Sequence, residues 1–191
     1  MDTAIPPDFK AALLSLRGHQ LRPEFLLQEV PAPAKIAPYA AALTGDVTHP
    51  EDSDSFIGSG RFVILYDPAG QAAWEGTMRI IVLSKAQLEP EMGEDPFLGE
   101  VGWAWLTDAL QEEQAAYHAL SGTVTRALSE TFGGLELHYG NVHIEIRASW
   151  TPKSTDLAPH LRAWALTTCQ AAGLPPDSEN VSNLPDQSWF S

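Results

Sequence analysis

The stretch RFVILYDPAG at residues 61–70, followed by TMRIIVLS at residues 77–84, is the clearest indication of the fold class. Both ends of this stretch are rich in β-branched, aliphatic and aromatic residues, which favour strands, and DPAG is a good turn sequence. We therefore expect the two runs to pair as an antiparallel hairpin. Each run carries apolar residues on both of its faces, so helices must cover at least one face of the sheet.

Three further segments are predicted to be strands of the same sheet. Residues 24–30 precede PAP at 31–33, whose missing N–H groups cannot continue a ladder, so this strand is expected at an edge. Residues 122–131 and 142–151 follow later in the chain. The last of these alternates cleanly between apolar and polar residues, which predicts one core face and one polar face. Residues 135–139 are either a short extra strand or a loop.

Helical spacing of apolar residues predicts helices at 8–17, 97–110 and 156–172, the last capped by Asp156 and ended by Gly173. Residues 37–43 are rich in alanine with Pro38 near their start, which predicts a short further helix.

The stretches between these elements are expected to be loops and linkers. Residues 44–60 hold turn formers and acids without periodicity and are expected to form a mobile loop, and residues 89–96 an extended acidic linker. Together, the predicted strands and helices indicate an α+β fold with a single antiparallel sheet of about five strands and helices packed on it. We expect one domain over 1–176 and a polar tail over 177–191.

The charge balance excludes some classes of function. The chain has 11 basic and 25 acidic residues and a formal net charge of −14, which repels nucleic acids and anionic membranes. A fold can still gather Arg61, Arg79, Arg126 and Arg147 on one surface, so a small anionic ligand stays open. With a single cysteine, Cys169, and no bilayer-spanning apolar run, a cytoplasmic location is expected.

Sequence motifs for cofactor binding and catalysis are absent, so no cofactor is predicted. Five carboxylates lie close together between residues 89 and 100, but their spacing matches no known metal loop. They are Glu89, Glu91, Glu94, Asp95 and Glu100. We read this stretch as a solvated connection and predict no metal site.

The polar side of strand 142–151 is the first candidate site. His143, Glu145 and Arg147 alternate and therefore project from the same face, where a base, an acid and an anion clamp could converge on a ligand. Arg126 on the preceding strand could join them. The alternative reading is the solvated face of an edge strand carrying a cross-strand charge pair.

The helix at 97–110 is the second candidate, because its apolar residues spread over about 200° of the helical wheel. Trp103 and Trp105 could form a docking surface for a partner, or be buried from two sides within the domain. Trp103 lies at the edge of the arc and is the best interface candidate. Trp189 and Phe190 near the end of the chain could dock back on the domain or contact another chain.

Several segments together resemble an actinobacterial protein family of unknown function, the domain of unknown function number three thousand, over about residues 6 to 176. The segments are Pro7 to Phe9 with Ala12 and Leu16–Arg17, Leu21 to Glu24, Pro31 to Pro33 with Ala37 to Ala40, Leu88 to Met92, Glu100 to Trp103 with Trp105–Leu106, and Arg147 to Pro152. The resemblance implies a cytoplasmic protein and supplies no reaction, cofactor or catalytic residues.

Our leading hypothesis is a non-enzymatic domain that binds a protein partner or a small ligand. The alternative is a small-molecule enzyme with His143 as base, Glu145 as its orienter and Arg147 or Arg126 as anion clamp. A third possibility is a structural subunit that forms a homodimer through an edge strand or the aromatic helix.

Overall fold

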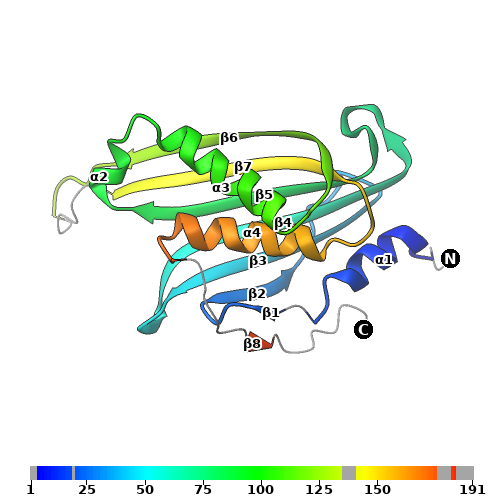
Figure 1. Cartoon of the computed structure of the whole chain (residues 1–191), viewed down its shortest axis with the longest axis horizontal. Helices are drawn as coiled ribbons and strands as arrows, with labels where there is room; N and C mark the ends of the chain where they lie inside the picture. Colours follow the sequence, from blue (N-terminus) through cyan, green and yellow to red (C-terminus); the bar gives the residue numbers. More distant parts are fainter. Residues whose placement is uncertain (1–3, 19, 135–140, 176–181, 184–191) are drawn as a thin grey trace.

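The computed structural model describes residues 4–18, 20–134, 141–175 and 182–183 (Figure 1). The helices are α1 (Pro7–Ser15), the 3-10 turn η1 (Ala72–Trp74), α2 (Pro90–Gly93), α3 (Leu98–Glu112) and α4 (Ala158–Ala171). The strands are β1 (Gln20–Leu21), β2 (Phe25–Val30), β3 (Tyr39–His49), β4 (Asp52–Gln71), β5 (Gly76–Leu88), β6 (Tyr117–Ser129), β7 (Asn141–Pro152) and β8 (Ser182–Asn183).

Six strands form one antiparallel sheet in the order β2-β3-β4-β5-β7-β6. The predicted hairpin is β4 and β5, with Phe62 opposite Val82. The predicted α+β fold and the edge position of β2 are confirmed. Strand β7, in contrast, lies between β5 and β6, so the reading of residues 142–151 as an edge strand is wrong.

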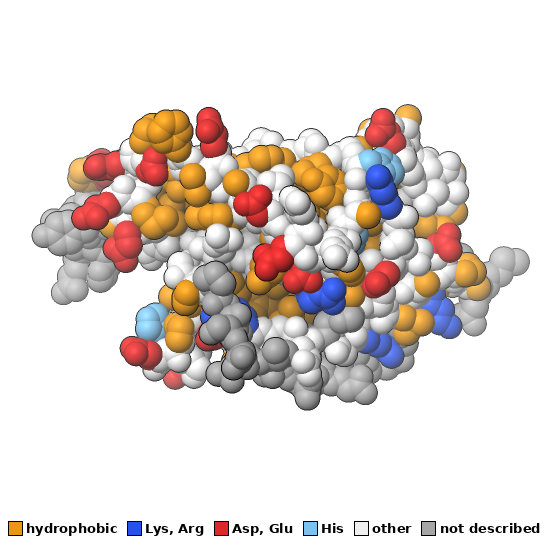
Figure 2. Space-filling view, in the orientation of Figure 1, with side chains coloured by type: hydrophobic (Ala, Val, Ile, Leu, Met, Phe, Trp, Pro, Cys, Tyr) orange, Lys and Arg blue, Asp and Glu red, His pale blue; other side chains and the backbone are white. Residues whose placement is uncertain are grey.

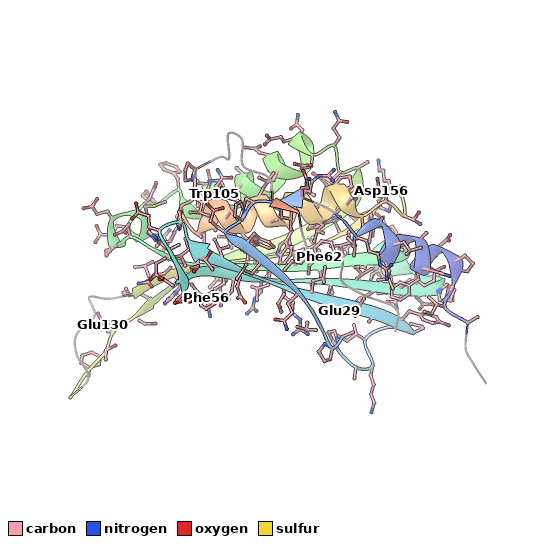
Figure 3. The ribbon with its side chains drawn as sticks, turned by 90° about the horizontal axis from the view of Figure 1, so that it is seen from below. Glu29, Phe56, Phe62, Trp105, Glu130 and Asp156 are labelled. Atoms are coloured by element: carbon pink, nitrogen blue, oxygen red, sulfur yellow. The ribbon has the colours of Figure 1, made fainter. Side chains whose placement is uncertain are left out.

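The helices α3 and α4 pack on one face of the sheet, with α1 at one end of the same layer (Figures 1 and 3). Trp164 of α4 lies between Phe25 and Phe62, with its ring centroid 5.2 Å from that of Phe25, and its Nε1 donates a hydrogen bond of 3.0 Å to the Leu83 carbonyl. Burial of such aromatic rings supplies much of the stability of a core. The predicted helical periodicity of α4 thus corresponds to its packing on the sheet.

The predicted helix at 37–43 is wrong, because residues 39–49 form strand β3 between β2 and β4. Alanine favours helices in isolation, but tertiary packing overrides this weak preference. In β3, Leu43 is buried on the helix side of the sheet and Ala42 on the other side. This alternation is the one that a strand covered on both faces requires.

The predicted loop at 44–60 is also wrong, because β3 and β4 extend through most of it and meet at a hairpin near His49 and Asp52. Its glycines are not turn residues. A Cβ atom on Gly45 would overlap the Phe25 ring, and one on Gly60 would lie 2.9 Å from the Trp164 ring. Glycine is required there because aromatic rings pack directly on the backbone of the strands.

The predicted extended linker at 89–96 contains one helical turn, α2, which begins at Pro90 because proline is well suited to a first helical position. Two residues of the predicted tail form β8, which pairs with β1. The segment 135–139, the rest of the tail and its Trp189 and Phe190 lie outside the described residues. Among the described helices, none is long and apolar enough to cross a membrane.

We call the sheet face opposite α3 and α4 the open face, because the helices lie on the other side of the sheet (Figure 3). Part of it is covered by a small apolar cluster, in which Val30, Ala32, Ala37 and Trp74 pack against Ala42, Val63 and Leu65. The remainder carries polar and charged side chains from β4, β5 and β7 around the apolar Ile81 and Leu83.

Candidate functional site

The side chains of His143, Glu145 and Arg147 share the open face, because their neighbours Ile144 and Ile146 are buried in the core. The Glu145 carboxylate forms ion pairs with two basic side chains. Arg147 Nη2 lies 3.2 Å from it, and Lys85 Nζ on β5 lies 3.4 Å from it. Lys85 and Glu145 are directly opposite each other in the β5–β7 register. The carboxylate therefore pairs with Lys85 on the neighbouring strand and with Arg147 on its own strand.

Arg126 does not join these three residues. It is opposite Ile144 in the β6–β7 register, which places it on the helix side of the sheet. Its Nη1 donates a hydrogen bond to the carbonyl oxygen of Gly93 at the end of α2. Arg126 thereby holds α2 against the sheet.

Arg79 is also on the open face but is buried near η1. Its guanidinium donates hydrogen bonds to Thr151 Oγ1 at 3.1 Å and to Ser149 Oγ at 2.9 Å. Burial lowers the pKa of Arg79, and the nearby charge of Glu75 opposes this in part. These contacts make Arg79 a structural link between β5 and β7.

Trp103 and Trp105 are half-buried and pack against the main core. The Trp103 ring lies on Gly122 of β6, where a Cβ atom would come within 2.6 Å of it. Trp103 therefore anchors α3 to β6, and only part of each indole faces solvent.

A cavity of about 1120 Å³ lies at one end of the molecule. Three segments line it: the β3–β4 hairpin, the junction of β5 with α2, and the last turn of α4 with the residues after it. The lining residues are 49–51, 55–57, 87–90, 92 and 170–175. It is open on one side, and its apolar wall includes Phe56, Leu88 and Met92.

The charge of this cavity is negative. Glu51 and Glu89 line it, and among the described lining residues there is no Lys or Arg. The C-terminal end of α4, at Ala171, adds the negative end of a helix dipole. Nδ1 of His49 accepts a hydrogen bond of 3.1 Å from the Glu51 amide, so the neutral imidazole carries its proton on Nε2. The cavity therefore favours positively charged groups.

Large apolar side chains are exposed at the rim and beyond it. Phe56 is 63% exposed and Met92 is 43% exposed. Further exposed apolar residues occur around α2, at the start of α3 and at the end of β6, namely Phe97, Val101, Leu128 and Phe132. Figure 2 shows hydrophobic side chains gathered over α2 and the start of α3 with acidic side chains among them. An exposed apolar surface of this kind is typical of a contact region.

The sequence did not predict this cavity, because two of its three walls come from the segments expected to be loop and linker. The available signal was the presence of Phe56 and Met92 within otherwise acidic stretches.

The histidines at 49 and 160 have defined partners, while those at 19 and 138 lie outside the described residues. His160 of α4 is buried, and its Nδ1 accepts a hydrogen bond of 2.9 Å from Trp150 Nε1. Burial lowers the pKa of His160 from 6.5 to about 4, with the charge of Asp156 opposing the shift. Its position three residues after Leu157 and four before Trp164 places it on the packed face of the helix.

The chain matches the DUF3000 family, described as a protein of unknown function, over residues 5–182, and it belongs to that family. The family expected from the sequence segments is thereby confirmed. No curated protein and no solved structure matches the chain.

Proposed function

We propose that this member of the DUF3000 family is a non-enzymatic interaction module, and that the cavity at the end of its sheet binds a basic segment of a partner protein through apolar anchor residues. The observation that carries the proposal is a large open cavity whose wall is both apolar and acidic. Apolar residues and carboxylates in the wall favour an occupant with both apolar and basic side chains.

The size of the cavity supports a polypeptide segment. Pockets for small ligands usually enclose roughly 300 to 1,000 Å³. At about 1120 Å³ and open on one side, this cavity exceeds that range. A peptide segment of several residues can fill such a space, while the rest of the partner chain continues through the open side.

The charge of the cavity supports a basic segment. Glu51, Glu89 and the C-terminal end of α4 all attract cations. Arg22, which donates a hydrogen bond to the carbonyl of the lining residue Pro175, is itself paired with Glu24. A second copy of this chain is disfavoured because two chains of net charge −14 repel each other. The exposed Phe56 ring can in addition stack on a Lys or Arg side chain of the partner.

The alternative function, an enzyme built around His143, is less well supported. Catalysis requires a concave site with convergent polar groups. The cavity described above is lined by none of His143, Glu145 and Arg147. The Glu145 carboxylate contacts Lys85 and Arg147.

Selection from a random peptide display library tests the proposal. The full chain is the target, and Phe56→Ala is the counter-target, since truncating an exposed ring should leave the fold intact. We expect the selected peptides to combine Lys or Arg with aromatic or aliphatic residues, and to bind Phe56→Ala at least about tenfold more weakly.

A charge-reversed target provides the matched control. Against Glu51→Lys with Glu89→Lys, the same library should yield acidic peptides in place of basic ones. Selection of acidic peptides by the unaltered chain, or equal binding of the selected peptides to Phe56→Ala, would contradict the proposal.

A further inference from the structure

The open face concentrates basic side chains in a chain that is strongly acidic as a whole. Arg61, Arg79, Lys85 and Arg147 all project from this face, as their register positions show. The carboxylates Asp46 and Glu145 both lie in the row of Lys85, which runs Asp46, Ser59, Lys85 and Glu145 across β3, β4, β5 and β7. Arg79 is occupied by its contacts with Ser149 and Thr151, which leaves three bases in the central part of the face.

These three bases surround one leucine. Arg61 on β4 and Arg147 on β7 are both directly opposite Leu83 on β5. Neighbouring strands lie about 4.8 Å apart, so the backbones of the two arginines are separated by about 10 Å. Lys85 follows Leu83 by two residues and therefore projects from the same side. The arrangement is a pair of guanidinium groups flanking an apolar side chain, with an ammonium group beside it.

The hydrogen-bonding capacity of these bases is only partly used. Arg61 Nε is shielded from solvent and has no hydrogen-bond partner among the described residues, while its Nη2 makes a long contact of 3.4 Å to the Pro31 carbonyl. The side chain of Arg147 is 64% exposed. The exposed guanidinium group of Arg147 therefore offers donors to an incoming acceptor, whereas the Arg61 Nε donor is shielded from it.

Glu145 shows that the bases can hold a carboxylate. Its two oxygens contact Lys85 and Arg147 in the present structure. An external anion has to compete with this internal one for the same donors. The competition predicts that removing the Glu145 charge strengthens anion binding, which a merely solvated face would not show.

The floor of the face is suited to an organic anion. Leu83 lies between the two arginines, and Ile81, two residues before it, is 37% exposed. Thr44 and Thr123 extend the row of Arg61 and Arg147 on either side and add hydroxyl donors. An apolar body over Ile81 and Leu83 would place its anionic group at the arginines.

We propose that the open face of the sheet, at Arg61, Leu83, Lys85 and Arg147, binds a small organic anion, a carboxylate or phosphate monoester attached to an apolar group. Guanidinium groups recognise both kinds of anion in bidentate geometry. A polyanion is excluded because the net charge of −14 repels it at long range. This site differs from the cavity in place and in the sign of its charge.

Titration of the full ¹⁵N-labelled chain with phenyl phosphate, followed by NMR, tests the inference, with inorganic phosphate as the probe that lacks an apolar group. We expect saturable shifts centred on residues 61, 83 and 147, and tighter binding of phenyl phosphate. Arg61→Gln and Arg147→Gln should each weaken binding about tenfold, since each removes a charge-assisted hydrogen bond.

Two further variants give the experiment its controls. Glu145→Gln should tighten binding about three- to tenfold by removing the internal competitor. Lys10→Gln, a base outside the sheet, should leave it unchanged. Absence of saturable shifts, a Glu145→Gln variant that binds no more tightly, or equal losses for Lys10→Gln and Arg61→Gln would overturn the proposal. Benzoate in place of phenyl phosphate then tells a carboxylate site from a phosphate site.

Discussion

Protonation of His160 should destabilise the fold in mildly acidic solution. The imidazole is buried, and its Nδ1 faces the Trp150 Nε1–H donor, so a proton on Nδ1 would oppose that donor and lose the hydrogen bond. Burial lowers its pKa to about 4, whereas an unfolded chain has the ordinary value of 6.5. Between these two pH values, the unfolded state binds more protons than the folded state.

The sign and the size of the effect follow from this difference. The full contribution of neutral His160 to the free energy of unfolding is present above pH 6.5, and it falls progressively as the pH approaches 4. One pKa unit is worth about 1.36 kcal/mol, so a shift from 6.5 to about 4 corresponds to about 3 kcal/mol.

Urea unfolding of the full chain between pH 7.5 and pH 4 measures it, with His160→Asn as the control. Asparagine does not titrate, and its side-chain oxygen can still accept the Trp150 hydrogen bond. All other titrating groups are shared, so the difference between the two curves isolates His160. We expect the original chain to lose about 3 kcal/mol relative to the variant over this range. Parallel curves would show that protonation of His160 does not destabilise the fold.

Three other substitutions have defined expectations. Gly60→Ala should destabilise the fold by about 1–3 kcal/mol, because the new Cβ would lie 2.6 Å from the Leu83 carbonyl oxygen and crowd Trp164. In α3, the Cβ atom of Gly99→Ala would have no atom within 4 Å, so this substitution should raise the free energy of unfolding by up to about 1 kcal/mol. Urea unfolding of both glycine variants measures these opposite effects. Trp103→Ala should lower the free energy of unfolding by about 2 kcal/mol in thermal or urea unfolding, because it uncovers Gly122. It should also weaken any complex that uses α3. No change in stability or in complex formation would exclude Trp103 as anchor and interface.

Hydrophobic patterning was sufficient to predict residues 61–66 of β4, most of β5 and β7, and α4. Each has a periodicity that follows from burial of one or both faces, and the structure confirms the pairing of β4 with β5. The pattern of β7 also placed His143, Glu145 and Arg147 on a common face. For these elements, local composition and tertiary environment agree.

Strand β3 could not be predicted in the same way. Its alanines favour a helix locally, and only pairing with β2 and β4 makes it a strand. Gly45 and Gly60 indicated turns because the aromatic rings that rest on them, Phe25 and Trp164, come from distant parts of the sequence. Such close approach is a property of the packed structure and leaves no local sequence signal.

The cavity depends even more on tertiary structure. Its walls come from residues near 50, near 90 and near 170, which only the fold brings together. The separation of Arg126 from Arg147 likewise follows from the β6–β7 register, since one residue of slip would exchange the faces. Charge composition alone suggested an anion site but could not select which bases share it.

A photoreactive phenylalanine analogue at position 56, introduced into the full chain in cells that produce it, tests whether the cavity binds a basic segment of a partner protein. The same analogue at position 14, an exposed leucine on α1 at the opposite end of the molecule (Figure 1), is the control. We expect a predominant polypeptide adduct from position 56, cross-linked next to Lys or Arg residues, that is absent from position 14 and reduced by Glu51→Gln with Glu89→Gln. Equal adducts from both positions, or no adduct from position 56, would contradict it.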